Sequence, residues 1–190
     1  MKHIAMLTLL LYLGIPSAYG NERSVTMTFS GNGALASPIN LQYPDSTTIE
    51  ENVAGNGTLG RFTLRNITAD ANSPSPDPPR TCSGGTLLFF PRVAGAAVLR
   101  FEDGSLLNVT LKEGGDCIDV AANVGQCTLT LQVAGGTGRF KNASGVLTYT
   151  ETALPVLADD FNNPVFFDET GGLTGTVSGV SEQQGPDDGQ

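Results

Sequence analysis

The chain has 190 residues, with 19 acidic and 10 basic side chains and a formal net charge of −9. An acidic surface repels phosphate groups, so this balance argues against binding to nucleic acid or to anionic membranes. The 24 glycines, the absence of tryptophan and the short runs rich in Thr, Val, Leu and Phe are typical of a turn-rich all-β protein.

The first 20 residues have the pattern of a secretory signal peptide. Lys2 precedes an apolar run at residues 4–15, and Ala18 and Gly20 occupy the −3 and −1 positions of a cleavage site. The run is about twelve residues long, whereas a bilayer-spanning helix needs roughly twenty. A membrane anchor or a buried first helix is the alternative. We expect cleavage after Gly20 and a secreted or extracellular protein, periplasmic or on the cell surface if the source is bacterial.

The mature chain is expected to form a single domain over residues 21–180, followed by a disordered acidic tail over residues 181–190. Cleavage would remove His3, the only histidine. Without histidine, Ser-His-Asp and Cys-His catalysis, imidazole metal sites and histidine general bases are excluded. The sequence also contains no phosphate-binding Gly-Lys-Thr loop and no dinucleotide fingerprint. We therefore expect no cofactor and no metal.

Apolar and polar residues alternate at 24–30 (SVTMTFS), which predicts the first strand of the mature chain. Residues 31–57 show no strong period and are expected to be irregular. Alternation resumes at 60–68. Four prolines within residues 74–79 then predict a long exposed loop.

Strand signals follow closely from residue 86 onward. An Asp-Gly turn at Asp103 and Gly104 predicts a hairpin, and Glu113 to Asp116 (EGGD) predicts a second turn. About eight strands joined by glycine turns, with no amphipathic helix, predict an all-β antiparallel closed β-barrel, with a β-sandwich as the alternative. In addition to 24–30 and 60–68, strands are expected at 86–93, 96–101, 105–112, 117–121, 127–134, 139–154, 164–169 and 172–180.

Three cysteines predict one disulfide and one free thiol in an oxidising compartment. Cys117 and Cys127 flank an expected hairpin tip, so we favour a Cys117–Cys127 bond. A bond from Cys82 to either of them is the open alternative. The cysteine spacing is not that of a zinc site.

Residues 133–149 (VAGGTGRFKNASGVLTY) resemble a short motif of the dirigent and allene oxide cyclase-like β-barrels. The matching positions are Gly135, Gly136, Thr137, Gly138, Phe140, Ala143 and Gly145. The glycines permit positive φ at a tight strand junction, and Phe140 is expected to plug the barrel end below it. The resemblance implies an eight-stranded barrel, often oligomeric, with an apolar cavity. The resemblance identifies no catalytic residue in this chain.

Polar side chains on otherwise apolar strand faces are the candidate ligand-binding residues. Tyr149 and Glu151 share the face of Leu147, and Asn66 lies on the apolar face of the strand at 60–68. If these faces line a barrel, burial would raise the pKa of Glu151 beside a phenol donor, and the pair would bind or protonate a small apolar ligand. The alternative places Tyr149 at the barrel rim and Glu151 in solvent.

An oxygen-rich stretch near the C-terminus is a candidate calcium site, although its spacing is not that of an EF-hand and a solvated turn explains it equally well. Its members are Asp159, Asp160, Asn162, Asn163, Asp168 and Glu169.

Three functions are consistent with the sequence. The first is a secreted binding or scaffold module that holds a small apolar ligand or a partner without covalent chemistry. The second is a dirigent- or cyclase-like enzyme that steers a cyclisation or coupling by confinement. The third is a structural extracellular protein. The expected partners are a small apolar ligand and further copies of the chain in a homo-oligomer, with no nucleic acid and no membrane.

Overall fold

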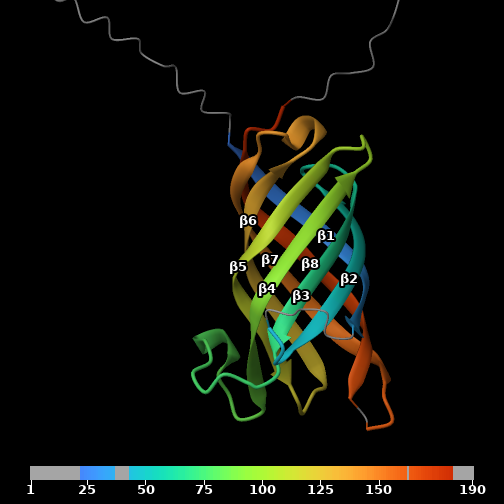
Figure 1. The fold of residues 1–190 in the computed structure, drawn as a ribbon, viewed down its shortest axis with the longest axis vertical. Coiled ribbons are helices and arrows are strands. Elements are labelled where there is room, and N and C mark those ends of the chain that lie inside the picture. Colours follow the sequence, from blue (N-terminus) through green and yellow to red (C-terminus); the bar gives the residue numbers. More distant parts are fainter. Residues whose placement is uncertain (1–21, 37–42, 162, 182–190) are drawn as a thin grey trace, which may run out of the picture.

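The computed structural model describes residues 22–36, 43–161 and 163–181. The predicted signal peptide and all but Ser181 of the predicted tail lie outside these residues. Eight antiparallel strands follow one another around a closed barrel in chain order, and the last pairs with the first (Figure 1). The prediction of a closed antiparallel β-barrel is confirmed.

Each strand is long, and two short 3₁₀ turns interrupt the all-β pattern. No helix among the described residues is long and apolar enough to cross a membrane. The elements are β1 (Arg23–Ala36), β2 (Ser46–Gly57), β3 (Phe62–Ala71), η1 (Arg80–Cys82), β4 (Leu87–Phe101), β5 (Leu106–Asp119), β6 (Val124–Gly136), η2 (Gly138–Phe140), β7 (Ser144–Ala158) and β8 (Pro164–Ser178).

The end of β1 lies where the sequence predicts irregular structure, and so does all of strand β2, so that prediction is wrong for residues 31–36 and 46–57. Strand β2 does alternate: Ile49, Glu51 and Val53 face the barrel interior. The interior-facing position at Glu51 is charged, which hides the alternation of apolar and polar residues on which the prediction depends.

Three pairs of predicted strands are each one continuous strand, β4, β5 and β8. The register shifts in β4 opposite Ala69 and Asp70, where Val93 is the extra residue. It shifts again in β5 between Leu111 and Glu113. A β-bulge inserts one residue, so the inward-facing residues change from even-numbered to odd-numbered positions or the reverse. In the sequence this interruption of the apolar–polar alternation looks like the end of one strand and the start of another. The predicted turn at 113–116 is therefore wrong, because these residues lie within β5.

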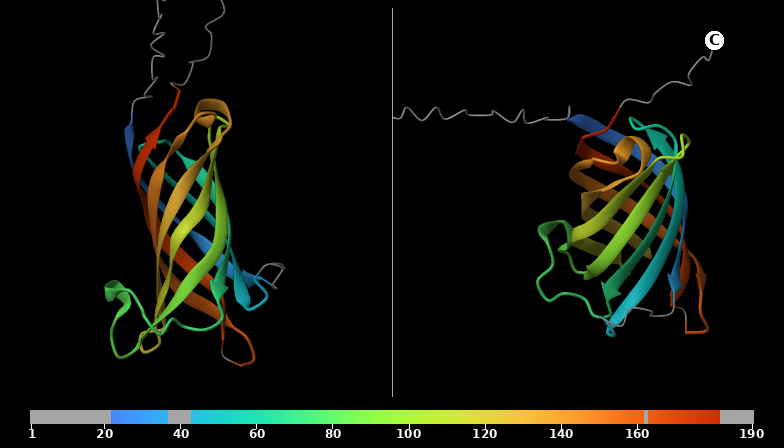
Figure 2. Two further views of the ribbon diagram at one scale, coloured as in Figure 1. Left: turned by 60° about the vertical axis from the view of Figure 1, so that its left-hand side comes forward. Right: turned by 45° about the horizontal axis from the view of Figure 1, so that its top comes forward.

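One end of the barrel, which we call the closed end, is filled by aromatic side chains. Here η2 brings Phe140, which is fully buried, to 4.8 Å from Phe101 between ring centroids. The guanidinium of Arg139 lies over both rings, 4.8 Å from the Phe101 centroid and 4.5 Å from that of Phe140. The start of β1 and the end of β8 also lie at the closed end (Figure 2).

The glycine motif forms the turn that carries Phe140 to the closed end. Gly135 and Gly138 have φ values of 81° and 56°, which L side chains rarely adopt. Gly136 has a different role: a Cβ there would lie 1.9 Å from the carbonyl oxygen of Leu106. The turn thus needs glycine for backbone conformation at two positions and for space at a third.

The single disulfide of the described residues joins Cys82 of η1 to Cys117 of β5, and Cys127 is a buried free cysteine. The predicted Cys117–Cys127 bond is therefore wrong, and the alternative with Cys82 holds. In the β5–β6 register Cys127 is opposite Asp116, not Cys117. Neighbouring residues of a strand point to opposite faces of the sheet, so Cys127 faces the interior while Cys117 faces outward, toward η1.

Candidate functional site

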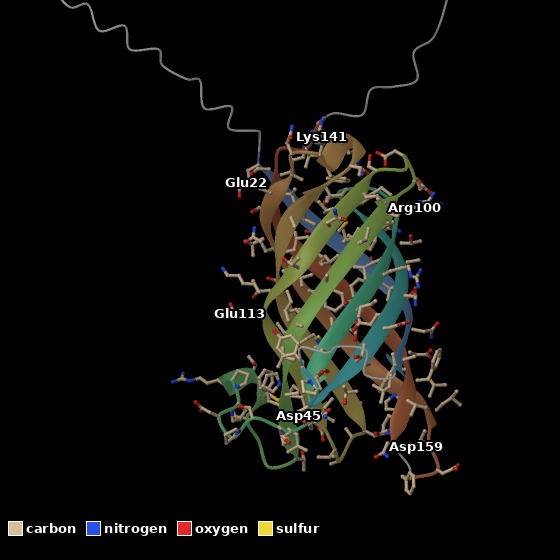
Figure 3. The ribbon with its side chains drawn as sticks, in the orientation of Figure 1. Glu22, Asp45, Arg100, Glu113, Lys141 and Asp159 are labelled. Carbon is tan, nitrogen blue, oxygen red and sulfur yellow. A yellow bond between two sulfur atoms is a disulfide. The ribbon has the colours of Figure 1, made fainter. Side chains whose placement is uncertain are left out.

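A cavity of about 470 Å³ occupies the end of the barrel opposite Phe140, which we call the open end. The labelled side chains Asp45 and Asp159 lie toward this end, and Lys141 lies at the closed end (Figure 3). This volume is within the range typical of small-molecule sites. The walls of the cavity are largely apolar and include Leu35, Ile49, Leu88, Phe90, Ile118, Val120, Pro164 and Phe167.

The inner part of this cavity, its floor, is built around one buried guanidinium. The side chain of Arg92 is 2% exposed and forms three ion pairs, each with a carboxylate from a different strand. Its Nε is 2.8 Å from Oδ1 of Asp70, its Nη1 is 3.1 Å from Oε1 of Glu51, and its Nη2 is 2.7 Å from Oδ2 of Asp116. The donors of Arg92 are therefore already shared among three partners. Charge-assisted hydrogen bonds of this kind fix side-chain positions strongly.

A second group of polar side chains meets the first at Glu51. Oε2 of Glu51 accepts hydrogen bonds from Nδ2 of Asn66 at 2.7 Å and from the hydroxyl of Tyr149 at 2.9 Å. The Tyr149 hydroxyl also lies within hydrogen-bonding distance of Oε2 of Glu151. A phenol has one proton to donate. When Tyr149 donates to Glu51, its contact with Glu151 is favourable if Glu151 keeps a proton and donates it.

Glu169 of β8 completes the floor and differs from the other carboxyl groups. Its residue is 2% exposed, and its Oε2 has no hydrogen-bond partner. Oxygen atoms of Glu51, Glu151 and Glu169 all lie within 4.8 Å of one another. Gly33 of β1 leaves the space that this carboxyl group occupies, because a Cβ there would lie 1.8 Å from Oε1 of Glu169.

Burial and mutual repulsion keep several of these acids protonated. Burial is the largest cause that raises the pKa of Asp70, to about 9, and that of Glu169, to about 8, and the charge of Glu51 adds to it at Glu169. Burial, together with the charges of Glu51 and Glu169, also raises the pKa of Glu151 well above its usual range. At Asp116 burial acts in the same direction, but the charge of Arg92 and hydrogen bonds outweigh it, and the net pKa is lowered.

Two further weak acids, Tyr149 and Cys127, contact residues of the floor without lining the cavity, and they stay neutral over the same range. Burial raises the pKa of the Tyr149 hydroxyl and of the Cys127 thiol well above their ordinary values. The floor therefore combines the ion pairing of Arg92 with three carboxyl groups, those of Asp70, Glu151 and Glu169, whose raised pKa values favour the protonated form near neutral pH. Such groups donate hydrogen bonds or protons to a molecule in the cavity.

The structure brings together the three residues that the sequence singled out. Tyr149 is fully buried, Glu151 is 7% exposed and Asn66 is 6% exposed. Asn66 and Tyr149 both donate hydrogen bonds to Glu51, and Tyr149 also contacts Glu151. Of the three, Glu151 lines the cavity. The alternative, with Tyr149 at the rim and Glu151 in solvent, does not hold. Whether these residues bind a ligand stays a prediction.

Reasoning from the sequence missed four residues of the floor, and it named a fifth, Glu169, only as part of the candidate calcium stretch. Asp70 had a usable signal, because it continues the inward face of Asn66 and Thr68 beyond the expected end of that strand. Glu51 had none, because it lies in a segment without a visible period. Arg92 and Asp116 had none, because in each strand a β-bulge separates them from the run of apolar inward-facing residues. The four missed residues are Asp70, Glu51, Arg92 and Asp116.

The oxygen-rich stretch at 159–169 does not converge on one point. Asp159 accepts hydrogen bonds from the backbone N–H groups of Phe161 and Asn163 and closes the β7–β8 turn. Oδ1 of Asp168 accepts a hydrogen bond from Nδ2 of Asn32, while Glu169 belongs to the cavity floor. Asn162 lies outside the described residues. The calcium alternative has no support from these positions.

Comparison with known proteins adds little to this description. No protein-family model matches the chain, and no curated protein matches it in sequence. Among solved structures, a pterocarpan synthase dirigent protein is similar, with 9% sequence identity over 92% of this chain and 99% of that chain and a TM-score of 0.36. This structural similarity is weak. At this TM-score it carries no argument about function.

Proposed function

We propose that the protein is a secreted binding module that holds one small, largely apolar molecule in the open end of its barrel. The observation that carries the proposal is the cavity of about 470 Å³ with apolar walls and a buried polar floor. Apolar walls supply affinity, and a few fixed polar groups supply orientation. A barrel whose interior were filled by side chains would leave only the structural function, so the cavity favours binding.

Secretion is part of the proposal and has separate support. The N-terminal sequence pattern is that of a signal peptide. The Cys82–Cys117 disulfide is of a kind that persists mainly in oxidising compartments.

A fluorescence titration with N-phenyl-1-naphthylamine, a neutral apolar probe, tests the binding function. Ile49→Trp places a large side chain on the cavity wall, and we expect it to weaken probe binding by about tenfold or more. Ile67→Trp is the matched control, because Ile67 is 54% exposed on the outer face of the neighbouring strand β3. Absence of saturable binding, or equal loss in both variants, would contradict the proposal. Native mass spectrometry of the secreted protein would report the ligand that it retains and the number of subunits.

The protonated carboxyl groups favour a second candidate, an enzyme that donates a proton to an apolar substrate. Glu151 combines a raised pKa with a contact to Tyr149 inside an apolar-walled cavity. This arrangement suits acid-assisted cyclisation or coupling, in which confinement supplies the geometry. Turnover of a polyene or phenolic substrate that Glu151→Ala and Tyr149→Phe both abolish would support the enzyme. Unchanged turnover in both variants would exclude this site.

A further inference from the structure

The cavity floor contains more acid than its base can balance. Among the described residues that line the cavity, Arg92 is the only basic side chain, and it faces five carboxyl groups. Its three ion-pair partners are Asp70, Glu51 and Asp116. Neither Glu151 nor Glu169 has a basic partner within 4 Å among the described residues. Buried carboxylates without a partner are costly, so this pair must hold protons or a cation.

An independent observation marks where a donor is missing. Oε2 of Glu169 is buried and accepts no hydrogen bond, although the residue is 2% exposed. A buried acceptor without a partner costs free energy unless a ligand or water supplies the donor. Glu169 lines the cavity, so a molecule entering from the open end can reach it. The missing partner is therefore a hydrogen-bond donor located on the cavity side of Glu169.

From these observations we infer that the cavity takes an apolar amine, with its ammonium group between Glu151 and Glu169 and its hydrocarbon part against the apolar walls. The inference rests on the proposed binding function and names the chemical class of its ligand. An ammonium group supplies three N–H donors and one positive charge. It thus satisfies the free oxygen of Glu169 and balances a carboxylate that Arg92 does not reach.

The surroundings fit a monovalent organic cation better than a metal ion. Both oxygens of Glu51 already accept hydrogen bonds, Oε1 from Arg92 and Oε2 from Asn66 and Tyr149. Calcium takes about six to eight oxygen ligands, and the remaining carboxyl groups offer few. The apolar walls have no part in binding a bare ion.

Three ligands of equal chain length test the inference on the wild-type protein. We would measure the dissociation constants of n-octylamine, 1-octanol and octanoate at pH 7.5 by displacement of N-phenyl-1-naphthylamine. The expected order of affinity is amine, alcohol, carboxylate, with the amine bound about tenfold more tightly than the alcohol. If the alcohol binds as tightly as the amine, the inference fails and the binding function stands. If none of them displaces the probe and the probe itself does not bind, the binding function fails as well.

Charge-removing variants locate the ammonium group. Glu169→Gln and Glu151→Gln should each bring the ratio of alcohol to amine dissociation constants down to about one. Glu113→Gln is the control, since Glu113 is exposed and lies away from the cavity. If Glu169→Gln does not fold, the comparison of the three ligands on the wild-type protein still tests the inference, because it needs no variant. A ratio that both floor variants leave unchanged would overturn the inference.

The pH dependence gives a second test on the wild type. An alkylammonium group resembles the lysine side chain, with a pKa of about 10.4, so it stays charged well above neutral pH. Glu169, with its pKa of about 8, must release a proton to pair with it. Amine affinity should therefore rise by up to about tenfold per pH unit between pH 6 and 8, while alcohol affinity should not. The other titratable groups that surround this pair are Glu51, Asp70, Arg92, Asp116, Cys127 and Tyr149.

Calcium chloride provides the competing outcome. We expect calcium at millimolar concentration to leave the melting temperature and the amine affinity unchanged. Calcium that raises the melting temperature and displaces the amine would assign the site to a metal ion and overturn the inference.

Discussion

Two carboxyl groups, those of Asp70 and Glu169, make folding depend on pH in an unusual direction. Their pKa values in the folded barrel, about 9 and about 8, lie far above those of an unfolded chain, which are about 4. The folded protein thus binds more protons than the unfolded chain between about pH 4 and pH 9. The contribution of these two groups to the free energy of unfolding is largest below pH 4. It is lost as the pH rises through their pKa values in the folded protein.

We therefore expect the free energy of unfolding to fall as the pH rises from 5 to 9. Each group contributes at most about 1.4 kcal/mol per pH unit within its window. Asp116, whose pKa is lowered, acts in the opposite direction only at acidic pH. Urea unfolding at pH 5, 7 and 9 measures the effect. Glu169→Gln should make the dependence shallower, whereas Glu113→Gln on the surface should not. A free energy of unfolding that rises from pH 5 to pH 9 would contradict the conclusion that Asp70 and Glu169 are protonated in the folded protein.

Gly33 affects stability through the space that it leaves for Glu169. A methyl group there would overlap the carboxyl group of Glu169, 1.8 Å from its Oε1. Because Glu169 is enclosed, Gly33→Ala should cost about 1–3 kcal/mol of unfolding free energy, measured in urea. Gly85→Ala is the matched control, since a Cβ at Gly85 meets nothing within 4 Å. Equal stability of the two variants would show that Glu169 moves aside freely.

At the scale of elements, the Cys82–Cys117 disulfide ties the loop between β3 and β4 to strand β5 across a sequence separation of 35 residues. Closing a loop of this length stabilises the folded state by about 2–4 kcal/mol, chiefly by restricting the unfolded chain. The double variant Cys82→Ala, Cys117→Ala should lose that amount in urea unfolding. Alkylation should modify one cysteine per chain, Cys127, and only after unfolding, because its thiol is buried. A peptide map with Cys127 in a disulfide would contradict this assignment.

The elements also show what the sequence alone can predict. Regular alternation at β1, β3, β6 and β7 is enough to identify strands, and closely spaced strands joined by glycine turns are enough to predict the closed barrel. Where a bulge changes parity, as in β4 and β5, the same rule splits one strand into two. The bulge residue of β4, Val93, directly follows Arg92, and the bulge of β5 directly follows Leu111. Both bulges lie at the level where the apolar interior gives way to the charged floor. Sequence reasoning therefore found Asn66 of β3 and Glu151 of β7, but it missed Asp70 at the end of β3 and the floor residues of β2, β4 and β5.

At the scale of the whole molecule, the barrel divides its interior between two tasks. The half next to η2 is filled by apolar side chains, and the half next to the β3–β4 and β7–β8 connections holds the cavity and its charged floor. A filled half compensates for the cost of buried charge and empty space in the other half. Stability and binding should therefore respond to different substitutions.

The same substitution at two phenylalanines tests this division. Phe140 is fully buried at the closed end, and Phe161 is 86% exposed in the β7–β8 turn. Phe140→Ala should cost about 3–5 kcal/mol of unfolding free energy, while Phe161→Ala should change it by less than about 0.5 kcal/mol. Probe binding is measured without urea, where the Phe140→Ala variant is still folded. Its affinity for N-phenyl-1-naphthylamine should stay within about twofold of the wild type, because the probe binds at the open end of the barrel. Loss of probe binding in a folded Phe140→Ala protein would show that the two halves are coupled, and it would place the stability of the floor under the control of the aromatic closed end.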